Sequence, residues 1–284
     1  MQRIAVLITC HNRKDKTLKC LEMLSSQVLP SQVELQVYLT DDGCTDGTGD
    51  AVREQFPDVN VIDGDGDLYW CGGMRLAWAE AAKSDYNYYL WANDDTHFYP
   101  DCIKKLLAVA EEKLAEKSKP CIVVGSVCDL KTGEWTYGGR QRRRIGKDIS
   151  GDKVFSEKTP VKCDAINGNC VLVPKEIFET IGNLSSDYTH CMGDHDYGFR
   201  AMQAGFEIWV APGFIGTCSK NPLAAWSSPK TPLFKRLRLL YSPKGLALKE
   251  YITFCKRHTG MNWIVYWLKA HLKTIFPQLW KLKK

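Results

Sequence analysis

The chain has 284 residues, of which 44% are hydrophobic and 25% are charged. These fractions exclude an intrinsically disordered protein, and the length suits one large globular domain or one domain with an appendage. The formal net charge of +5 is uneven: the tail from Lys230 to Lys284 has 13 Lys and Arg residues and one acid, which gives it +12 and leaves −7 for the rest. A basic tail on an acidic body indicates an anionic surface as a partner.

The 12 cysteines form no CxxC pair, which argues against a zinc ribbon or a thioredoxin-like redox site. Most of them lie within apolar runs, so we expect reduced thiols that are buried as small hydrophobic side chains. No signal peptide precedes the first strand-like run, and we therefore expect a cytoplasmic protein.

Strand-like and helix-like segments alternate over the first two-thirds of the chain. Apolar runs and helical periodicity predict strands over residues 3–9, 33–40, 59–62, 86–91 and 121–127, and helices over 18–24, 46–56, 73–83 and 103–114. This alternation predicts an α/β fold, in which a mostly parallel sheet carries helices on both faces and binds ligands beyond the carboxyl ends of its strands. The acids at 41–42 and 93–95 directly follow strands, so the two clusters should meet at one edge of the sheet.

Residues 138–153 interrupt this pattern. They are polar, contain glycines and include the arginines at 142–144. The composition predicts a mobile loop, which is either simply solvated or contacts an acceptor or a phosphate group.

Helical character returns in the tail near residues 246–256 and 263–272. The longest apolar run there, 263–268, is far shorter than the ~20 residues that span a membrane. Lys, Arg and Trp together are typical of a helix at a membrane surface, although a helix packed on the body with a solvated basic face has the same composition. We favour a membrane over a nucleic acid, because phosphate contacts would leave the apolar run unused.

Two acidic turns follow predicted strands. In Asn93-Asp94-Asp95 the adjacent carboxylates repel each other unless something neutralises them. Mg²⁺ or Mn²⁺ would do so and can also bridge a diphosphate, whereas the alternative is an acidic surface turn. Asp41 and Asp42 could accept hydrogen bonds from a base or a ribose, while Asp46 is suited to begin the next helix as its N-cap.

A third acidic cluster surrounds Asp194 and Asp196. These residues could serve as a general base and its orienting partner. The alternative is a pair of acids at the start of a helix, with Asp196 paired to Arg200 at i,i+4.

Four segments resemble conserved motifs of glycosyltransferase family two in order and spacing: residues 4–13, 39–48, 90–96 and 193–205. The resemblance extends over roughly residues 3–220. Residues 69–78 look like the donor loop and helix of the rhamnosyl- and galactofuranosyltransferase-like members, and residues 167–174 resemble the acceptor-side strand of the family.

The resemblance implies a GT-A-type, Rossmann-like domain over residues 1–222, with a mostly parallel central sheet flanked by helices, and a basic, aromatic helical appendage over 223–284. It implies that the donor nucleotide contacts Thr9, His11, Arg13, Asp41, Asp42, Gly72, Gly73, Arg75 and Asp94. The metal ligands would be Asp95 and Asn93, joined by Cys218 or His190, since Cys218 stands where many members carry a histidine. Asp194 matches the catalytic base, with Arg200 as its structural partner, and the acceptor side would include Trp70, Asn167, Gly168, Asn169 and Asp196.

The resemblance further implies a metal-assisted, inverting transfer of a hexose or deoxyhexose from a UDP- or dTDP-sugar. The acceptor would be a hydroxyl of a lipid-linked or cell-surface polysaccharide, such as an O-antigen or a capsule, at the inner face of the membrane. A nucleotidyltransferase is the second possibility, but residues 9–13 lack the glycine-rich phosphate loop that it needs. A third is a sugar-nucleotide-binding protein with a degenerate site, which Asn93 and Gly193 favour.

Overall fold

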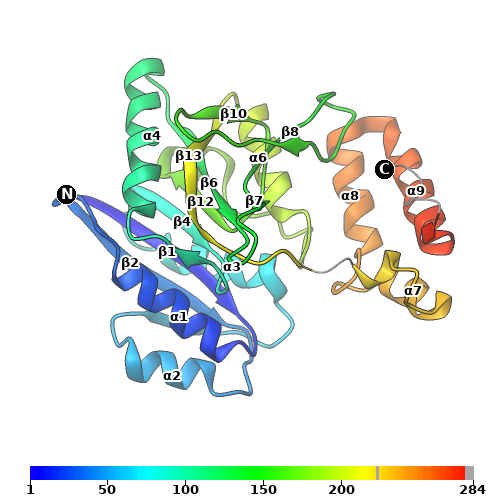
Figure 1. The fold of residues 1–284 in the computed structure, drawn as a ribbon, viewed down its shortest axis with the longest axis horizontal. Helices are drawn as coiled ribbons and strands as arrows, with labels where there is room; N and C mark the ends of the chain where they lie inside the picture. The colour runs from blue at the N-terminus through cyan, green and yellow to red at the C-terminus, as the bar shows by residue number, and fades with distance from the viewer. Residues whose placement is uncertain (222–223, 279–284) are drawn as a thin grey trace.

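The computed structural model describes residues 1–221 and 224–278. At its centre a ten-stranded sheet has the order β10-β13-β6-β12-β4-β1-β2-β3, with β5 paired to β13 and β7 to β6 (Figure 1). Its strands are β1 (Gln2–Cys10), β2 (Val33–Asp41), β3 (Asn60–Asp63), β4 (Tyr88–Ala92), β5 (His97–Phe98), β6 (Cys121–Cys128), β7 (Trp135–Tyr137), β10 (Val161–Cys163), β12 (Cys170–Pro174) and β13 (Glu207–Thr217). A second, three-stranded sheet contains β8 (Gly139–Gln141), β9 (Asp152–Lys153) and β11 (Ala165–Ile166).

The body and the tail both contribute helices. Those of the body are α1 (Lys14–Ser25), α2 (Thr48–Gln55), α3 (Tyr69–Ala81), α4 (Cys102–Lys117), α5 (Lys175–Ile181) and α6 (Gly193–Gln203). Those of the tail are α7 (Leu233–Leu240), α8 (Leu248–Thr259) and α9 (Trp263–Ile275), with short 3₁₀ turns at η1 (Ala225–Ser227) and η2 (Gly260–Asn262). The predicted strands and helices between residues 3 and 127 are confirmed, except that α3 begins four residues before the predicted Gly73.

Strand direction brings the acidic turns together. β3, β2, β1 and β4 run parallel, whereas β12 runs antiparallel between β4 and β6. Cys10 at the end of β1 lies opposite Asp41 at the end of β2. The turns that follow β2 and β4 therefore leave the sheet at the same edge, as the sequence predicts.

Both faces of the sheet are buried. In β1, Ile4 and Val6 belong to the core shared with α1 and α4, while Ala5 and Leu7 belong to the core shared with α3 and α6. Successive side chains of a strand point to opposite faces, so a continuous apolar run such as β1 needs helices on both sides. All 12 cysteines are free and ten are buried, which confirms their role as small hydrophobic side chains.

The prediction of a loop over residues 138–153 is confirmed only for its middle part, residues 142–151. The segment contains β8 and β9 of the small sheet, and the buried Arg142 forms an ion pair with Asp164, with Nε and Oδ2 3.1 Å apart. The guanidinium also stacks on Phe199. A buried charge is tolerated where it is paired, and this partner lies 22 residues away in the sequence, beyond the reach of local patterns.

The tail has a small core of its own and packs beside α6 (Figure 1). Its internal core contains Trp226, Leu240, Leu246, Leu248 and Ala270. A separate cluster joins Phe254 and Cys255 of α8 to Tyr188 and Phe199 of the body. The predicted domain boundary falls at residues 222–223, which lie outside the described residues. None of the helices described is long and apolar enough for a membrane span.

Candidate active site

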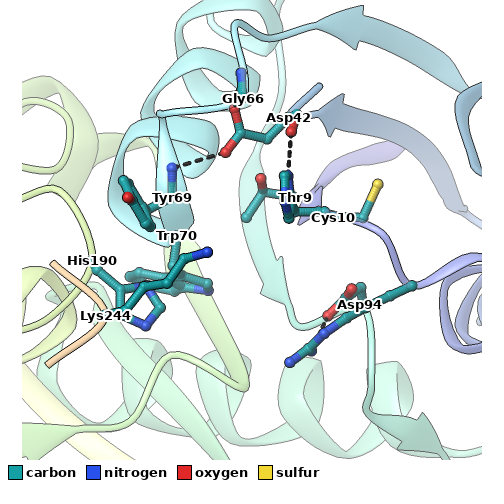
Figure 2. Close-up of a pocket in the computed structure, with 11 residues that line it drawn as sticks. Thr9, Cys10, Asp42, Gly66, Tyr69, Trp70, Asp94, His190 and Lys244 are labelled. Atoms are coloured by element: carbon teal, nitrogen blue, oxygen red, sulfur yellow. Dashed lines mark hydrogen bonds and ion pairs between the residues drawn. The ribbon is translucent and has the colours of Figure 1, made fainter. Parts of the chain in front are cut away.

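A cavity of about 320 Å³ lies at the sheet edge where β1, β2 and β4 end (Figure 2). Several sequence-predicted site residues line it together: Thr9, His11, Arg13, Asp42, Trp70, Asp94 and His190. The other lining residues, which are not among the sequence-predicted site residues, are Cys10, Gly66, Tyr69 and Lys244. Segments that are far apart in the chain thus share one concave site.

Asp42 is 2% exposed and holds the start of α3 in place. Its carboxylate accepts hydrogen bonds from the backbone N–H groups of Gly66 (2.9 Å), Leu68 (3.2 Å) and Tyr69 (2.9 Å). Its backbone carbonyl oxygen lies 2.6 Å from Nδ1 of His11. A carboxylate offers about four acceptor positions, so roughly one remains for a ligand.

The predicted donor residues of α3 lie beside the cavity rather than in its lining. Gly73 packs against β1 so closely that a Cβ would overlap the hydroxyl of Thr9, and its carbonyl accepts a 2.8 Å hydrogen bond from Thr40. Gly72 is buried one residue earlier in the same helix. Arg75 donates to the carbonyls of Ser185 and Tyr188 at 3.0 and 2.7 Å and so fixes the segment that leads to α6.

Arg13 spans the two carboxylates of the Asn93-Asp94-Asp95 turn. Its Nη1 lies 3.0 Å from Oδ1 of Asp94 and 2.9 Å from Oδ2 of Asp95. Burial raises the pKa of Asp94 to about 6, against the positive charge of Arg13, which lowers it. The repulsion between the two acids is thus partly relieved by an internal cation.

The remaining atoms of this turn fit a divalent cation in part. Oδ2 of Asp94 is buried without a hydrogen-bond partner among the described residues, so one hard oxygen is uncommitted. Asn93 uses its amide oxygen to accept a 2.8 Å hydrogen bond from Nε1 of Trp70. Cys218 lies beside Asp95, with Sγ 3.6 Å from Oδ1, and burial followed by the charge of Asp95 raises the pKa of its thiol to about 12.

A different group of three possible ligands lies under the cavity. One ligand atom from each of Cys10, Asp41 and Cys44 lies within 4.8 Å of the others. Asp41 is already engaged, since its Oδ1 accepts the backbone N–H of Cys44 at 2.9 Å. It therefore shapes the turn and does not line the cavity.

Asp194 lies in the first turn of α6 and connects to the cavity through Gly168. Its Oδ2 accepts the backbone N–H of Gly168 at 3.1 Å, and its Oδ1 accepts the backbone N–H of His195 at 2.8 Å. The indole of Trp70 packs on Gly168 so tightly that a Cβ there would overlap it. The side chain of Asp194 remains 20% exposed, so the carboxylate can reach a ligand.

The other predicted acceptor-side residues of this region hold loops together. Asn167 accepts a 3.5 Å hydrogen bond from the backbone N–H of Gly138. Asn169 is buried; its carbonyl accepts the backbone N–H of Asn93 at 3.2 Å, and its side-chain amide lies 3.5 Å from Sγ of Cys218.

The structure does not place Asp196 on the acceptor side, and this expectation is corrected. Asp196 is fully buried and faces α8: its Oδ1 lies 2.9 Å from Nη1 of Arg257 and 2.8 Å from Nε2 of His258. Arg200 pairs with Oδ2 at 2.8 Å, as the i,i+4 spacing predicts. Burial opposes the ionisation of Asp196, but the hydrogen bonds from His258, Arg257 and Arg200 prevail and bring its pKa to about 2.

Backbone strain gathers around the cavity. Three residues, Asn12 (φ 52°), Tyr69 (φ 52°) and Met192 (φ 71°), adopt the left-handed backbone conformation. This conformation is energetically unfavourable for residues other than glycine. Each borders a site segment: the end of β1, the start of α3 or the start of α6. Such strain persists where the surrounding structure fixes the backbone, which is common at functional sites.

Some of the lining residues that were not predicted lie near a recognisable sequence signal, and others do not. Gly66 and Tyr69 adjoin the Gly/Asp-rich loop and the donor-type helix, so proximity in sequence was a usable signal. Lys244 comes from the tail and has no local signal, because 38 residues separate it from the last recognised motif, residues 193–205.

Several solved structures share the fold of this chain. A search of curated protein sequences gives no match. Among solved structures, the mannosyltransferase PcManGT from Pyrobaculum calidifontis in complex with GDP-Man and Mn²⁺ superposes with a TM-score of 0.54 at 16% identity, over 96% of this chain and 87% of that chain. TarS 1-349 from S. aureus in complex with UDP-GlcNAc gives a TM-score of 0.55 at 13% identity, over 90% of this chain and 72% of that one.

These similarities establish the GT-A-type fold, with its α/β sheet flanked by helices and its C-terminal helical region. The sequence itself matches the model of the family described as "Glycosyl transferase family 2" over residues 5–178, which include most of β1, all of β2 and β4, and the turns that follow these strands. The chain therefore belongs to glycosyl transferase family 2.

Proposed function

We propose that the chain is an inverting glycosyltransferase that moves a hexose or deoxyhexose from a UDP- or dTDP-sugar to a hydroxyl of a lipid-linked or cell-surface polysaccharide acceptor. The observation that carries the proposal is the cavity that two acidic turns line and beside which a third acidic turn lies. Asp42 and Asp94 line it, and Asp194 connects to its wall through Gly168 and Trp70.

Asp194 is the proposed general base. It takes the proton of the acceptor hydroxyl, the hydroxyl oxygen forms a bond to the anomeric carbon, and the bond from that carbon to the diphosphate breaks on the opposite face. One displacement inverts the anomeric centre and releases a nucleoside diphosphate. The backbone N–H groups of Gly168 and His195 fix the orientation of the carboxylate for this step.

Asp95 and Asp94 would hold Mg²⁺ or Mn²⁺, with Cys218, which lies beside Asp95, as a further ligand. His190, the other expected ligand, lies across the cavity from Asp94. Two of the similar structures are complexes with a nucleotide-sugar, and one of these complexes also contains Mn²⁺. When bound, the cation neutralises charge on the leaving diphosphate. Arg13 must then turn away from one or both carboxylates, toward the diphosphate.

We further propose that the tail lies on an anionic membrane surface. On α9, Ile264, Val265, Leu268, Leu272 and Ile275 are each 40–48% exposed. Their spacing follows the helical period, so they form one apolar stripe, which faces away from the buried Ala270. An apolar stripe on a helix of a basic segment suits the interface between lipid headgroups and acyl chains.

A sugar-nucleotide-binding protein without activity is the second candidate. The ion pairs of Arg13 favour it, because they neutralise Asp94 and Asp95 without a metal.

Incubation with a panel of UDP- and dTDP-sugars and simple acceptors, in Mg²⁺, in Mn²⁺ and in a chelator, separates the candidates. The proposal predicts metal-dependent release of free nucleoside diphosphate and, by NMR, a product whose anomeric configuration is opposite to that of the donor. Binding of donors without release under any condition would favour the second candidate, and retention of configuration would exclude the single displacement.

A further inference from the structure

One wall of the cavity belongs to the tail. Lys244, in the turn between α7 and α8, lines the cavity together with His190 and Trp70, and Figure 2 shows these three side chains across the cavity from Asp94. Lys244 thus extends the site beyond the segment that matches the family model, which ends at residue 178.

The position of Lys244 is fixed by its turn. The backbone N–H of Gly245 donates to the carbonyl of Ser242 at 2.9 Å, and a Cβ on Gly245 would overlap the carbonyl of Leu239, so only glycine fits there. Leu246 follows at once and is buried in the core of the tail. The backbone that carries Lys244 is therefore fixed by the hydrogen-bonded turn and by the burial of Leu246.

The helix after this turn is fastened to the same wall. Glu250 in α8 accepts hydrogen bonds from the backbone N–H of Thr189 at 2.9 Å and from its hydroxyl at 2.7 Å. The next residue, His190, lines the cavity. Farther along α8, Arg257 and His258 bind Asp196, two residues from the proposed base.

The charge of Lys244 is uncommitted. Within residues 1–221 and 224–278 it makes no hydrogen bond or ion pair through its side chain, whereas Arg13, the other lining cation, is held by Asp94 and Asp95. Lys244 is then the available positive charge on its side of the cavity.

An ammonium group carries three N–H donors and suits a phosphate oxygen. We propose that Lys244 binds a phosphate group in the cavity, and that the tail thereby contributes a substrate-binding residue. This inference rests on the proposed function, in which both a donor diphosphate and a phosphate of a lipid-linked acceptor are available sources.

The test compares Lys244→Met and Lys244→Arg with Lys249→Met, which removes an exposed lysine of the same segment outside the cavity lining. Calorimetry measures the Kd of UDP and dTDP with Mn²⁺, and separately the Kd of a short-chain polyprenyl phosphate. We expect Lys244→Met to weaken one of them roughly tenfold, as for loss of one charged hydrogen bond, with Lys244→Arg retaining most of the affinity and Lys249→Met unchanged. The probe affected identifies the source of the phosphate.

Equal Kd values for the unaltered chain and Lys244→Met with every probe, or no binding of any probe by the unaltered chain, would overturn the inference. The melting temperature of each variant checks that it is folded. If the unaltered chain binds a nucleoside diphosphate through Lys244 but releases none from any sugar donor, the proposed function fails while this inference stands.

Discussion

The body and the tail of this protein are built on different principles. The body buries both faces of a large sheet and concentrates its polar chemistry at one edge. The tail has only a small core and leaves an apolar stripe of α9 exposed. Yet the two share a wall of the cavity, and besides a small apolar cluster they are joined by a few buried polar contacts. A basic appendage can therefore contribute to the wall of a cavity that lies mainly in the body.

The largest expected effect lies in the body. Asp194→Asn keeps the shape of the side chain but removes the base, so we expect kcat to fall by about 10²–10⁴ while the Kd of the donor stays within about twofold. Steady-state kinetics and donor titration measure the two quantities. Asp187→Asn, an exposed acid of the segment leading to α6, is the matched control and should retain normal turnover. Near-normal turnover of Asp194→Asn would show that the base is assigned wrongly.

The contact of Asp196 in the body with Arg257 and His258 in the tail gives the next largest effect. Asp196→Ala leaves Arg257, His258 and Arg200 without their shared anion, and removal of one partner of a buried ion pair costs about 3–5 kcal/mol. Asp187 also contacts Arg257 but is 44% exposed, so Asp187→Ala should cost at most about 1 kcal/mol. Urea unfolding measures the free energy of unfolding of each variant. Equal losses for the two variants would mean that Asp196 does not stabilise the contact between body and tail.

Low pH should weaken the same contact of Asp196 with the tail. The pKa of Asp196 is about 2 in the folded chain and near 3.8 in the unfolded chain. The contribution of Asp196 to the free energy of unfolding is therefore complete above about pH 5 and is lost as the pH falls toward 2. The difference amounts to about 2–3 kcal/mol. The free energy of unfolding measured from pH 6 to pH 2.5 should fall more steeply for the unaltered chain than for Asp196→Asn. Parallel curves would contradict the depressed pKa.

The smallest expected effect concerns the exposed apolar side chains of α9 in the tail, compared with one of α4 in the body. Leu268→Gln with Leu272→Gln on α9 should weaken binding to vesicles of anionic lipid about tenfold, because each removes an apolar side chain that would enter the interface. Leu114→Gln on α4 is a matched control, since Leu114 is 44% exposed and Leu268 and Leu272 are 48% and 45% exposed. Co-sedimentation measures binding, and an equal effect of the body and tail variants would remove the argument for a membrane-facing tail.

Local patterns were sufficient for much of the body. The continuous apolar run of β1 predicted a strand buried on both faces, and the acids after β2 and β4 predicted a shared edge, because both inferences need only neighbouring residues and strand direction. The predicted start of α3 is wrong because it depends on Asp42, whose carboxylate accepts the N–H groups of Gly66, Leu68 and Tyr69 from more than 20 residues away.

Distance in sequence also explains the other misses. The i,i+4 pairing of Asp196 with Arg200 was visible, but its partners Arg257 and His258 lie 61 and 62 residues away. Their contact arises only when α8 packs beside α6. Lys244 reaches the cavity by the same packing, so no motif around it could have marked it as a site residue.

The central claim is that acidic turns from distant parts of the chain enclose one diphosphate-and-cation pocket. A crystal structure with an unhydrolysed nucleotide-sugar and Mn²⁺ tests it most directly. We expect the nucleoside beside Thr9 and Asp42, the cation on Asp95, and the sugar within reach of Asp194. A nucleotide bound on another face, away from all of these residues, would contradict it.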